Sequence, residues 1–83
     1  MSHMFDPEAV DLAALATQLR NLFAGAVEGP VVGRTRLRDA VAEHLACSQP
    51  DSERIVDTMV GRGFLVRRER PAGMVEWLIQ VPE

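Results

Sequence analysis

The chain has 83 residues, a formal net charge of −3 and one cysteine. This length allows a single domain with a modest core, and one cysteine excludes an internal disulfide. No apolar run reaches the roughly 18 residues of a membrane span and no signal peptide is recognisable, so we expect a cytoplasmic protein that does not contact membranes. All nine basic residues are arginines, which indicates the coding bias of a GC-rich bacterial genome.

Charge is distributed unevenly along the chain. Residues 1–4 resemble an expression-tag remnant, so we expect residues 5–83 to form one domain. Residues 34–70 hold eight arginines against six acids, whereas the segments on both sides are negative. Domains dedicated to DNA binding are usually basic overall, because phosphate neutralisation dominates their affinity. The negative total therefore weighs against a purely DNA-binding role.

The first predicted element is a helix that starts at Asp6-Pro7-Glu8, where Asp6 suits the N-cap and Pro7 the first helical position. Leucines then recur at helical spacing, and the helix is expected to end near Gly25 or Gly29. The apolar stripe consists of Leu12, Leu15, Leu19 and Leu22. We expect this stripe to lie mainly in the core. Its first three leucines, flanked by small alanines, are also the candidate interface for a homodimer or a protein partner.

Two further helices are predicted between residues 35 and 61. Thr35 is expected to cap the second helix, and Ser48, followed by Pro50 and Asp51, to cap the third. The third helix is expected to stop at Gly61-Arg62-Gly63. The predicted apolar faces are Leu37, Ala40, Val41 and Leu45 in the second helix and Ile55, Val56, Met59 and Val60 in the third.

The C-terminal part of the chain predicts a hairpin. Residues 64–68 have the composition of a strand, Pro71-Ala72-Gly73 supplies turn chemistry, and residues 74–81 form the returning strand. Its alternation places Trp77, Ile79 and Val81 on one face, which we expect to be core. Glu76 and Gln80 occupy the other face, where a partly exposed Leu78 is a further candidate interface residue.

This order of elements, carried by the stretch from Ser48 to Val81, resembles the winged helix-turn-helix superfamily. The resemblance implies an α+β fold of three helices and a small antiparallel sheet with a wing hairpin. It also implies that Val31-Val32-Gly33 forms a short strand that pairs with the wing. The superfamily includes transcription regulators, replication and chromosome-maintenance factors, and pure protein-interaction modules, so the fold does not settle the function.

The resemblance makes the arginines of the wing candidates for contact with nucleic acid. Arg67, Arg68 and Arg70 lie where a wing would meet the DNA backbone, and guanidinium groups bind phosphate well. The alternative is an edge strand whose charges prevent aggregation. In a regular strand Arg67 and Arg68 point to opposite faces, so only part of the trio can form one patch.

A second group of candidates flanks the start of the second helix. Arg34 and Arg36 can meet the DNA backbone there, with Arg38 nearby. The alternative, which we slightly favour, is local pairing of Arg36 and Arg38 with Asp39 and Glu43, because exposed pairs at helical spacing are common and weak.

The third helix would enter the DNA groove, and its composition is the main objection to DNA binding. Its predicted outer face consists of Asp51, Ser52, Glu53, Arg54, Asp57, Thr58 and Arg62. One carboxylate is tolerable there, because it can accept from cytosine, but three argue for weak or partner-assisted binding or for a protein ligand. Arg54 and Thr58, one turn apart, are the best candidates for base contacts.

The sequence contains no recognisable pattern of catalytic residues. His44 and Cys47 are too few to bind a metal, and no nucleophile with a base, cofactor loop or small-molecule site is evident, so we expect neither catalysis nor a cofactor. The leading hypothesis is a DNA-binding or DNA-associated module of a bacterial regulator that contacts double-stranded DNA. The alternative is a protein–protein interaction module in a larger bacterial complex, with little or no DNA binding.

Overall fold

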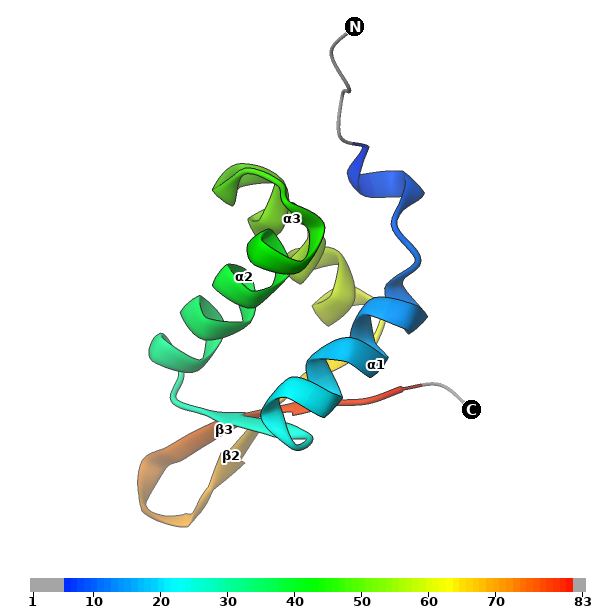
Figure 1. Ribbon diagram of the computed structural model, residues 1–83. Helices are drawn as coiled ribbons and strands as arrows, with labels where there is room; N and C mark the ends of the chain where they lie inside the picture. Colours follow the sequence, from blue (N-terminus) through cyan, green and yellow to red (C-terminus); the bar gives the residue numbers. More distant parts are fainter. Residues whose placement is uncertain (1–5, 82–83) are drawn as a thin grey trace, which may run out of the picture.

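The computed structural model describes residues 6–81, and the predicted tag remnant lies outside this range. Three helices, α1 (Leu12–Phe23), α2 (Val32–Leu45) and α3 (Gln49–Gly61), combine with three strands, β1 (Ala26–Glu28), β2 (Leu65–Arg70) and β3 (Met74–Ile79) (Figure 1). Two short 3-10 turns, η1 (Pro7–Ala9) and η2 (Pro71–Gly73), precede α1 and join β2 to β3. The predicted α+β fold is confirmed, and the arrangement is compatible with a winged helix.

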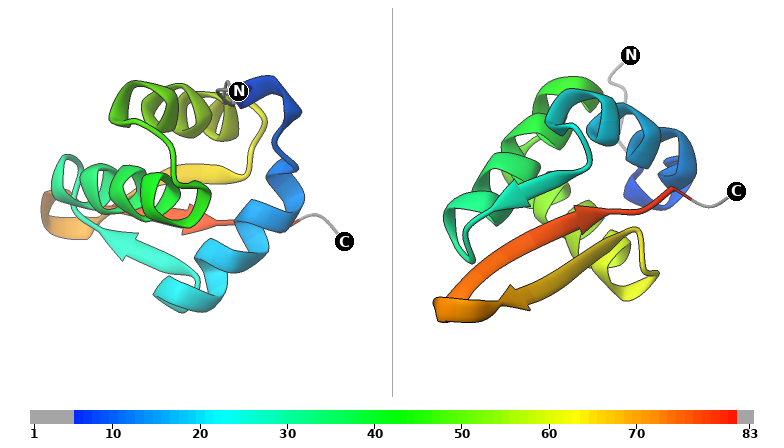
Figure 2. Two further views of the ribbon diagram at one scale, coloured as in Figure 1. Left: turned by 45° about the horizontal axis from the view of Figure 1, so that its top comes forward. Right: turned by 90° about the horizontal axis from the view of Figure 1, so that it is seen from below.

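The sheet is antiparallel, with strand order β1-β3-β2. The short strand β1 pairs with β3 from Ala26 opposite Leu78 to Glu28 opposite Glu76. Strands β2 and β3 form a longer hairpin that projects past the helices (Figure 2). This hairpin is the wing of the molecule. Its tip is turned by η2, where Ala72 and Gly73 both have positive φ.

The core lies between the three helices and one face of the sheet. Its buried members are Leu15, Ala16, Leu19, Val27, Leu37, Val41, Ile55, Val56, Met59, Leu65, Trp77 and Ile79. The prediction that Trp77 belongs to the core is confirmed, since it is only 6% exposed. Its indole Nε1 donates a hydrogen bond to the Gly29 carbonyl at 3.1 Å, which satisfies the polar atom of this side chain.

The predicted start of the first helix is wrong. Asp6 does act as a cap, accepting from the Glu8 amide at 3.0 Å, but it caps only η1. The chain becomes extended again at Val10, and α1 begins after Asp11, whose carboxylate accepts from the Ala14 amide at 3.1 Å. Asp6 and Asp11 can each cap a helix. The α-helix begins after Asp11, and from there the leucine stripe faces the core. The predicted end near Gly25 is confirmed.

The predicted strand at residues 31–33 is also wrong, because the short strand lies five residues earlier, at Ala26–Glu28. Helix α2 begins after Val31, and Thr35 is inside it rather than at its cap. A side chain at Gly33 would place its Cβ 2.8 Å from the Glu28 carbonyl oxygen and 3.0 Å from Trp77 Cδ1. The first turn of α2 therefore packs directly against β1 and Trp77, a contact that the local sequence does not reveal.

Helix α3 follows the prediction closely. Ser48 caps it, accepting from the Asp51 amide at 3.3 Å, and the helix ends at Gly61. The buried stripe differs at one edge, because Ser52 is fully buried whereas Val60 is 37% exposed. Ser52 continues the stripe of buried positions one turn towards the N-terminus. Its hydroxyl donates to the Arg38 carbonyl of α2, which makes burial of this polar side chain tolerable.

Candidate nucleic-acid interface

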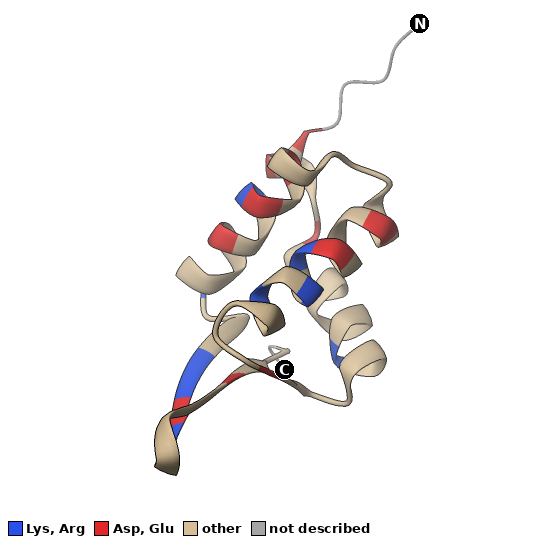
Figure 3. Ribbon diagram, turned by 90° about the vertical axis from the view of Figure 1, so that its left-hand side faces the viewer, with Lys and Arg blue, Asp and Glu red and all other residues tan. Residues whose placement is uncertain are grey.

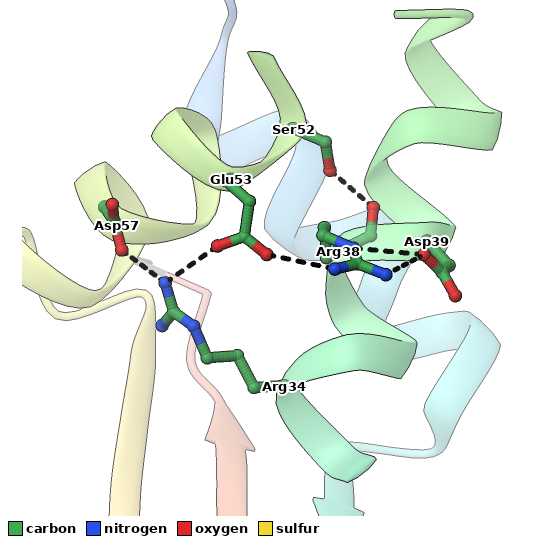
Figure 4. A network of polar contacts seen from close by, with 6 residues as sticks. All are labelled: Arg34, Arg38, Asp39, Ser52, Glu53 and Asp57. Carbon is green, nitrogen blue, oxygen red and sulfur yellow. Dashed lines mark hydrogen bonds and ion pairs between the residues drawn. The ribbon is translucent and has the colours of Figure 1, made fainter. Parts of the chain in front are cut away.

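Figure 3 marks the basic and acidic positions along the ribbon. In Figure 4 the side chains of arginines of α2 and carboxylates of α3 face each other across the contact between the two helices. Arg34 binds Asp57 and, at 3.5 Å, Glu53. Glu53 also accepts from Arg38 at 3.5 Å, and Arg38 binds Asp39 at 3.0 Å. We call these five side chains the α2–α3 ladder. The hydrogen bond that Asp39 accepts raises the pKa of the Arg38 guanidinium, so this group stays charged.

The ladder shows that two of the acids on the third helix are bound to arginines of the same chain. Glu53 and Asp57 were predicted to lie on the outer face of the third helix, and both are paired with arginines of α2. The ladder of two arginines and three carboxylates has a formal net charge of −1. The predicted local pairing of Arg38 with Asp39 is present, yet the other partners lie 15 to 23 residues away in the sequence. Arg34 already binds two carboxylates of its own chain, so fewer of its donors are available to a DNA phosphate.

The remaining α2 candidate, Arg36, lies on a different side of the helix. Its guanidinium carbon is 5.2 Å from the centre of the Phe23 ring of α1, a cation–π distance. Arg36 therefore faces α1, whereas Arg34 faces α3. The two arginines that the sequence placed together do not form one patch.

The two α3 candidates stay on the surface. Arg54 and Thr58 are both exposed, and the Thr58 hydroxyl donates to the Arg54 carbonyl at 2.9 Å. Arg54 takes part in none of the ion pairs found within residues 6–81. Its guanidinium thus keeps all its donors available, while the Thr58 oxygen can still accept a hydrogen bond.

Arg54 and Thr58 also line a groove of about 760 Å³ between α3 and the N-terminal segment. Arg62 lines the same side of this groove, and the carboxylates of Glu8 and Asp11 line the other. An anion that approaches Arg54 along this flank meets these two negative charges as well. The N-terminal segment therefore weakens the positive field of α3.

The wing contains a feature that the sequence did not reveal. Glu76, in the central strand β3, is only 5% exposed, although it lies on the sheet face opposite the helices. Arg68 lies directly across from it on β2 and binds its carboxylate, and Arg70 Nη1 lies 3.5 Å from Glu76 Oε2. Glu28 of β1 is the neighbour on the other side. We call Arg68, Arg70 and Glu76 the wing cluster.

Simple electrostatics explains the wing cluster. A buried carboxylate is unfavourable without a partner, and a second glutamate directly across a strand pair adds repulsion. Two guanidinium groups offset both effects and leave the cluster with a net charge of about +1. The arginine side chains remain 55% and 50% exposed, so donors not used by Glu76 can reach an external anion.

Arg67 does not belong to the wing cluster. It lies opposite Trp77 in the register and binds Glu69 at 3.3 Å, whereas Arg68 lies opposite Glu76. Neighbouring strand residues point to opposite faces, as the sequence analysis expected. The position of Glu76 was predictable in principle, because counting outwards from the turn pairs Arg70 with Met74 and Arg68 with Glu76.

The candidate interface leucines differ in how exposed they are. Leu15 and Leu19 are each 1% exposed and present no surface to a partner, because they fill the core between α1 and the sheet. Leu12 and Leu78 are half-buried. The strongly exposed leucine of the stripe is Leu22, at 66%, which was not among the candidate interface residues.

Two further questions concern metal ions and membranes. No group of three or more His, Cys, Asp or Glu side chains there could hold a metal ion. None of the helices within residues 6–81 is long and apolar enough to span a bilayer. Comparison with known proteins gave no match to any protein-family model, curated protein or solved structure.

Proposed function

We propose that this domain binds double-stranded DNA weakly, through phosphate contacts of its wing, as a regulatory module of a bacterial protein. The observation that carries this proposal is the wing cluster, in which a buried Glu76 holds two half-exposed guanidinium groups. Arginine side chains fixed in this way lose little conformational entropy when they bind a phosphate, and their planar forks match its oxygens.

Helix α3 supplies the second set of contacts in this proposal. Arg54 and Thr58 are exposed one turn apart, so they can reach a base edge or a phosphate together. The carboxylates of Glu53 and Asp57 oppose binding less than their number suggests, because Arg34 and Arg38 pair with them and partly offset their charge.

The proposed affinity is low. The whole chain has a net charge of −3, and five of its nine arginines form ion pairs within the described residues. Non-specific DNA binding depends on released counterions, and therefore on the number of phosphates that free basic groups neutralise. We expect dissociation constants in the micromolar range, roughly 10⁻⁶ to 10⁻⁴ M, at low salt.

The test is fluorescence anisotropy of a labelled random-sequence duplex, titrated with the protein at two low salt concentrations. Arg70→Ala is expected to weaken binding by about threefold to tenfold and to reduce the salt dependence by about one phosphate contact. The matched control is Arg20→Ala, which removes the same charge from an exposed position on α1. If both variants bind as the unmodified chain does, the wing is not the contact.

A second candidate function is supported by different residues. Leu22, Val31 and Val32 are 66%, 72% and 65% exposed, respectively, and large exposed apolar side chains are candidates for contact with a protein partner. In this alternative the domain is an interaction module of a larger complex. It predicts no DNA binding at the lower salt concentration and a stoichiometric protein partner in a pull-down from native extract.

A further inference from the structure

The surface between α1 and α2 plays no part in the candidate nucleic-acid interface. In Figure 1 the two helices have similar slopes and are connected by the strand β1. A groove of about 510 Å³ lies between them, and its apolar lining comes from Leu22, Phe23 and Ala40. Val32, one turn before Arg36 on α2, is also exposed. Apolar side chains this exposed gain free energy when a partner covers them.

The charges along this side of α2 are complementary to those of a second, antiparallel copy of the same helix. Arg36 lines the N-terminal part of the groove and Glu43 its C-terminal part. Asp39, which binds Arg38, lies between them. Arg36 and Glu43 are seven residues apart, two helical turns, and so share one side of the helix. When two such helices lie antiparallel across a two-fold axis, the arginine of each lies opposite the glutamate of the other. The opposed helix dipoles favour the same orientation.

We propose that the occupant of this groove is a second copy of the chain. The two α2 helices pack antiparallel near Ala40, each Leu22 enters the groove of the other copy, and Arg36 pairs with the partner's Glu43 at both ends. Such an isologous contact uses the same patch twice, which requires a self-complementary surface. The charge pattern of α2 meets that requirement.

This dimer is independent of DNA binding and compatible with it. Arg34 and Arg38 bind carboxylates of α3 and do not line the groove. Asp39 is the one member of the α2–α3 ladder that does. The wing cluster lies on β2 and β3. Dimerisation therefore leaves Arg54 and the wing arginines free, and the proposal goes beyond the proposed function without resting on it.

The apolar part of the proposal is tested by sedimentation equilibrium across about 10 to 500 µM protein. The unmodified chain is expected to pass from 9.2 kDa towards twice that mass as concentration rises. Leu22→Asp is expected to weaken association at least about tenfold, because the charge enters the apolar contact. The matched control is Met74→Asp, at an exposed apolar position on the wing, which is expected to dimerise normally. Circular dichroism confirms that each variant folds.

The antiparallel arrangement is tested by a charge swap. Arg36→Glu and Glu43→Arg are each expected to weaken dimerisation, and the double variant is expected to restore it, because both pairs are then re-formed in reverse. The double variant also lacks the contact of Arg36 with Phe23, so recovery excludes that contact as the cause. A chain that stays monomeric at 500 µM, a Leu22→Asp variant that dimerises normally, or a double variant without recovery overturns the proposal.

Discussion

At the scale of single residues, Glu76 is the least expected feature of the molecule. Alternation in the strand correctly placed it on the face away from Trp77, where a glutamate is normally exposed, yet it is 5% exposed. Its burial results from Arg68 and Arg70, which bind it from the adjacent strand. Alternation predicts the face of a side chain, but not what covers it, because the cover comes from another strand.

The wing cluster makes a prediction that separates charge from position. Glu76→Gln removes a negative charge from the wing, so simple electrostatics predicts tighter DNA binding. If the carboxylate holds the arginines in place, as we propose, binding instead weakens because both guanidinium groups become mobile. We expect the second outcome, together with a loss of stability of about 1 kcal/mol, measured by urea denaturation.

The control for this experiment is Glu69→Gln, which removes the same charge from an exposed position on β2, the strand that pairs with the strand of Glu76. Its partner Arg67 lies outside the wing cluster, so this variant is expected to bind DNA slightly more tightly. Equal gains of affinity in both variants would show that Glu76 contributes only its charge.

Cys47 provides a second prediction at this scale. Burial, with the nearby charge of Asp51 as a smaller contribution, raises the pKa of the Cys47 thiol. Because the thiolate is the reactive form, iodoacetamide is expected to modify the folded protein more slowly at pH 8 than the urea-unfolded chain. The raised pKa also means that this group favours folding below its unfolded pKa, and the contribution is lost as pH rises through its folded pKa. Equal alkylation rates would contradict the burial effect.

At the scale of elements, the sequence predicted what is encoded locally. The Ser48 cap, the end of α3 at Gly61 and the turn at Pro71–Gly73 each depend on neighbouring residues and are confirmed. The start of α2 and the position of β1 depend on the contact of Gly33 with Glu28 and Trp77, which are distant in sequence or in another element. The neighbouring residues alone therefore predicted both the start of α2 and the position of β1 several residues too late in the chain.

The α2–α3 ladder was missed for the same reason. Helical spacing suggested partners for the arginines within α2, and Arg38 does bind Asp39. The carboxylates of α3 approach only because the two helices pack against each other, with Ser52 bound to the Arg38 carbonyl at the crossing. Composition identified the acids of α3 correctly but not their partners.

Glu53 is the central member of the ladder, because it binds both Arg34 and Arg38. Glu53→Gln keeps the shape of the side chain and breaks both ion pairs, so we expect a loss of stability of about 0.5 to 1 kcal/mol at low salt. Screening should remove most of this difference in 1 M NaCl. A difference that persists undiminished at high salt would mean that packing rather than charge is responsible.

At the scale of the whole molecule, the distribution of charge matters more than its sum. Arginines in the ladder are already neutralised, Arg36 faces α1, and the acids Glu8 and Asp11 line the groove beside Arg54. Arg67 binds Glu69, so the groups that remain for phosphate contact are Arg54, Arg62 beside it and the wing cluster. Although residues 34–70 have a positive net charge, the fold therefore leaves only a small basic surface.

This count predicts the salt dependence of DNA binding. Three net positive charges, from Arg54, Arg62 and the wing cluster as a whole, give a slope of about −2.7 for the logarithm of the association constant against the logarithm of salt concentration, per bound copy. Anisotropy titrations at several salt concentrations measure it directly. A slope near zero would exclude phosphate contacts. A slope of about −4.5 or steeper would require at least two further contacts, as expected if Arg34 and Arg38 are released from their carboxylates on binding.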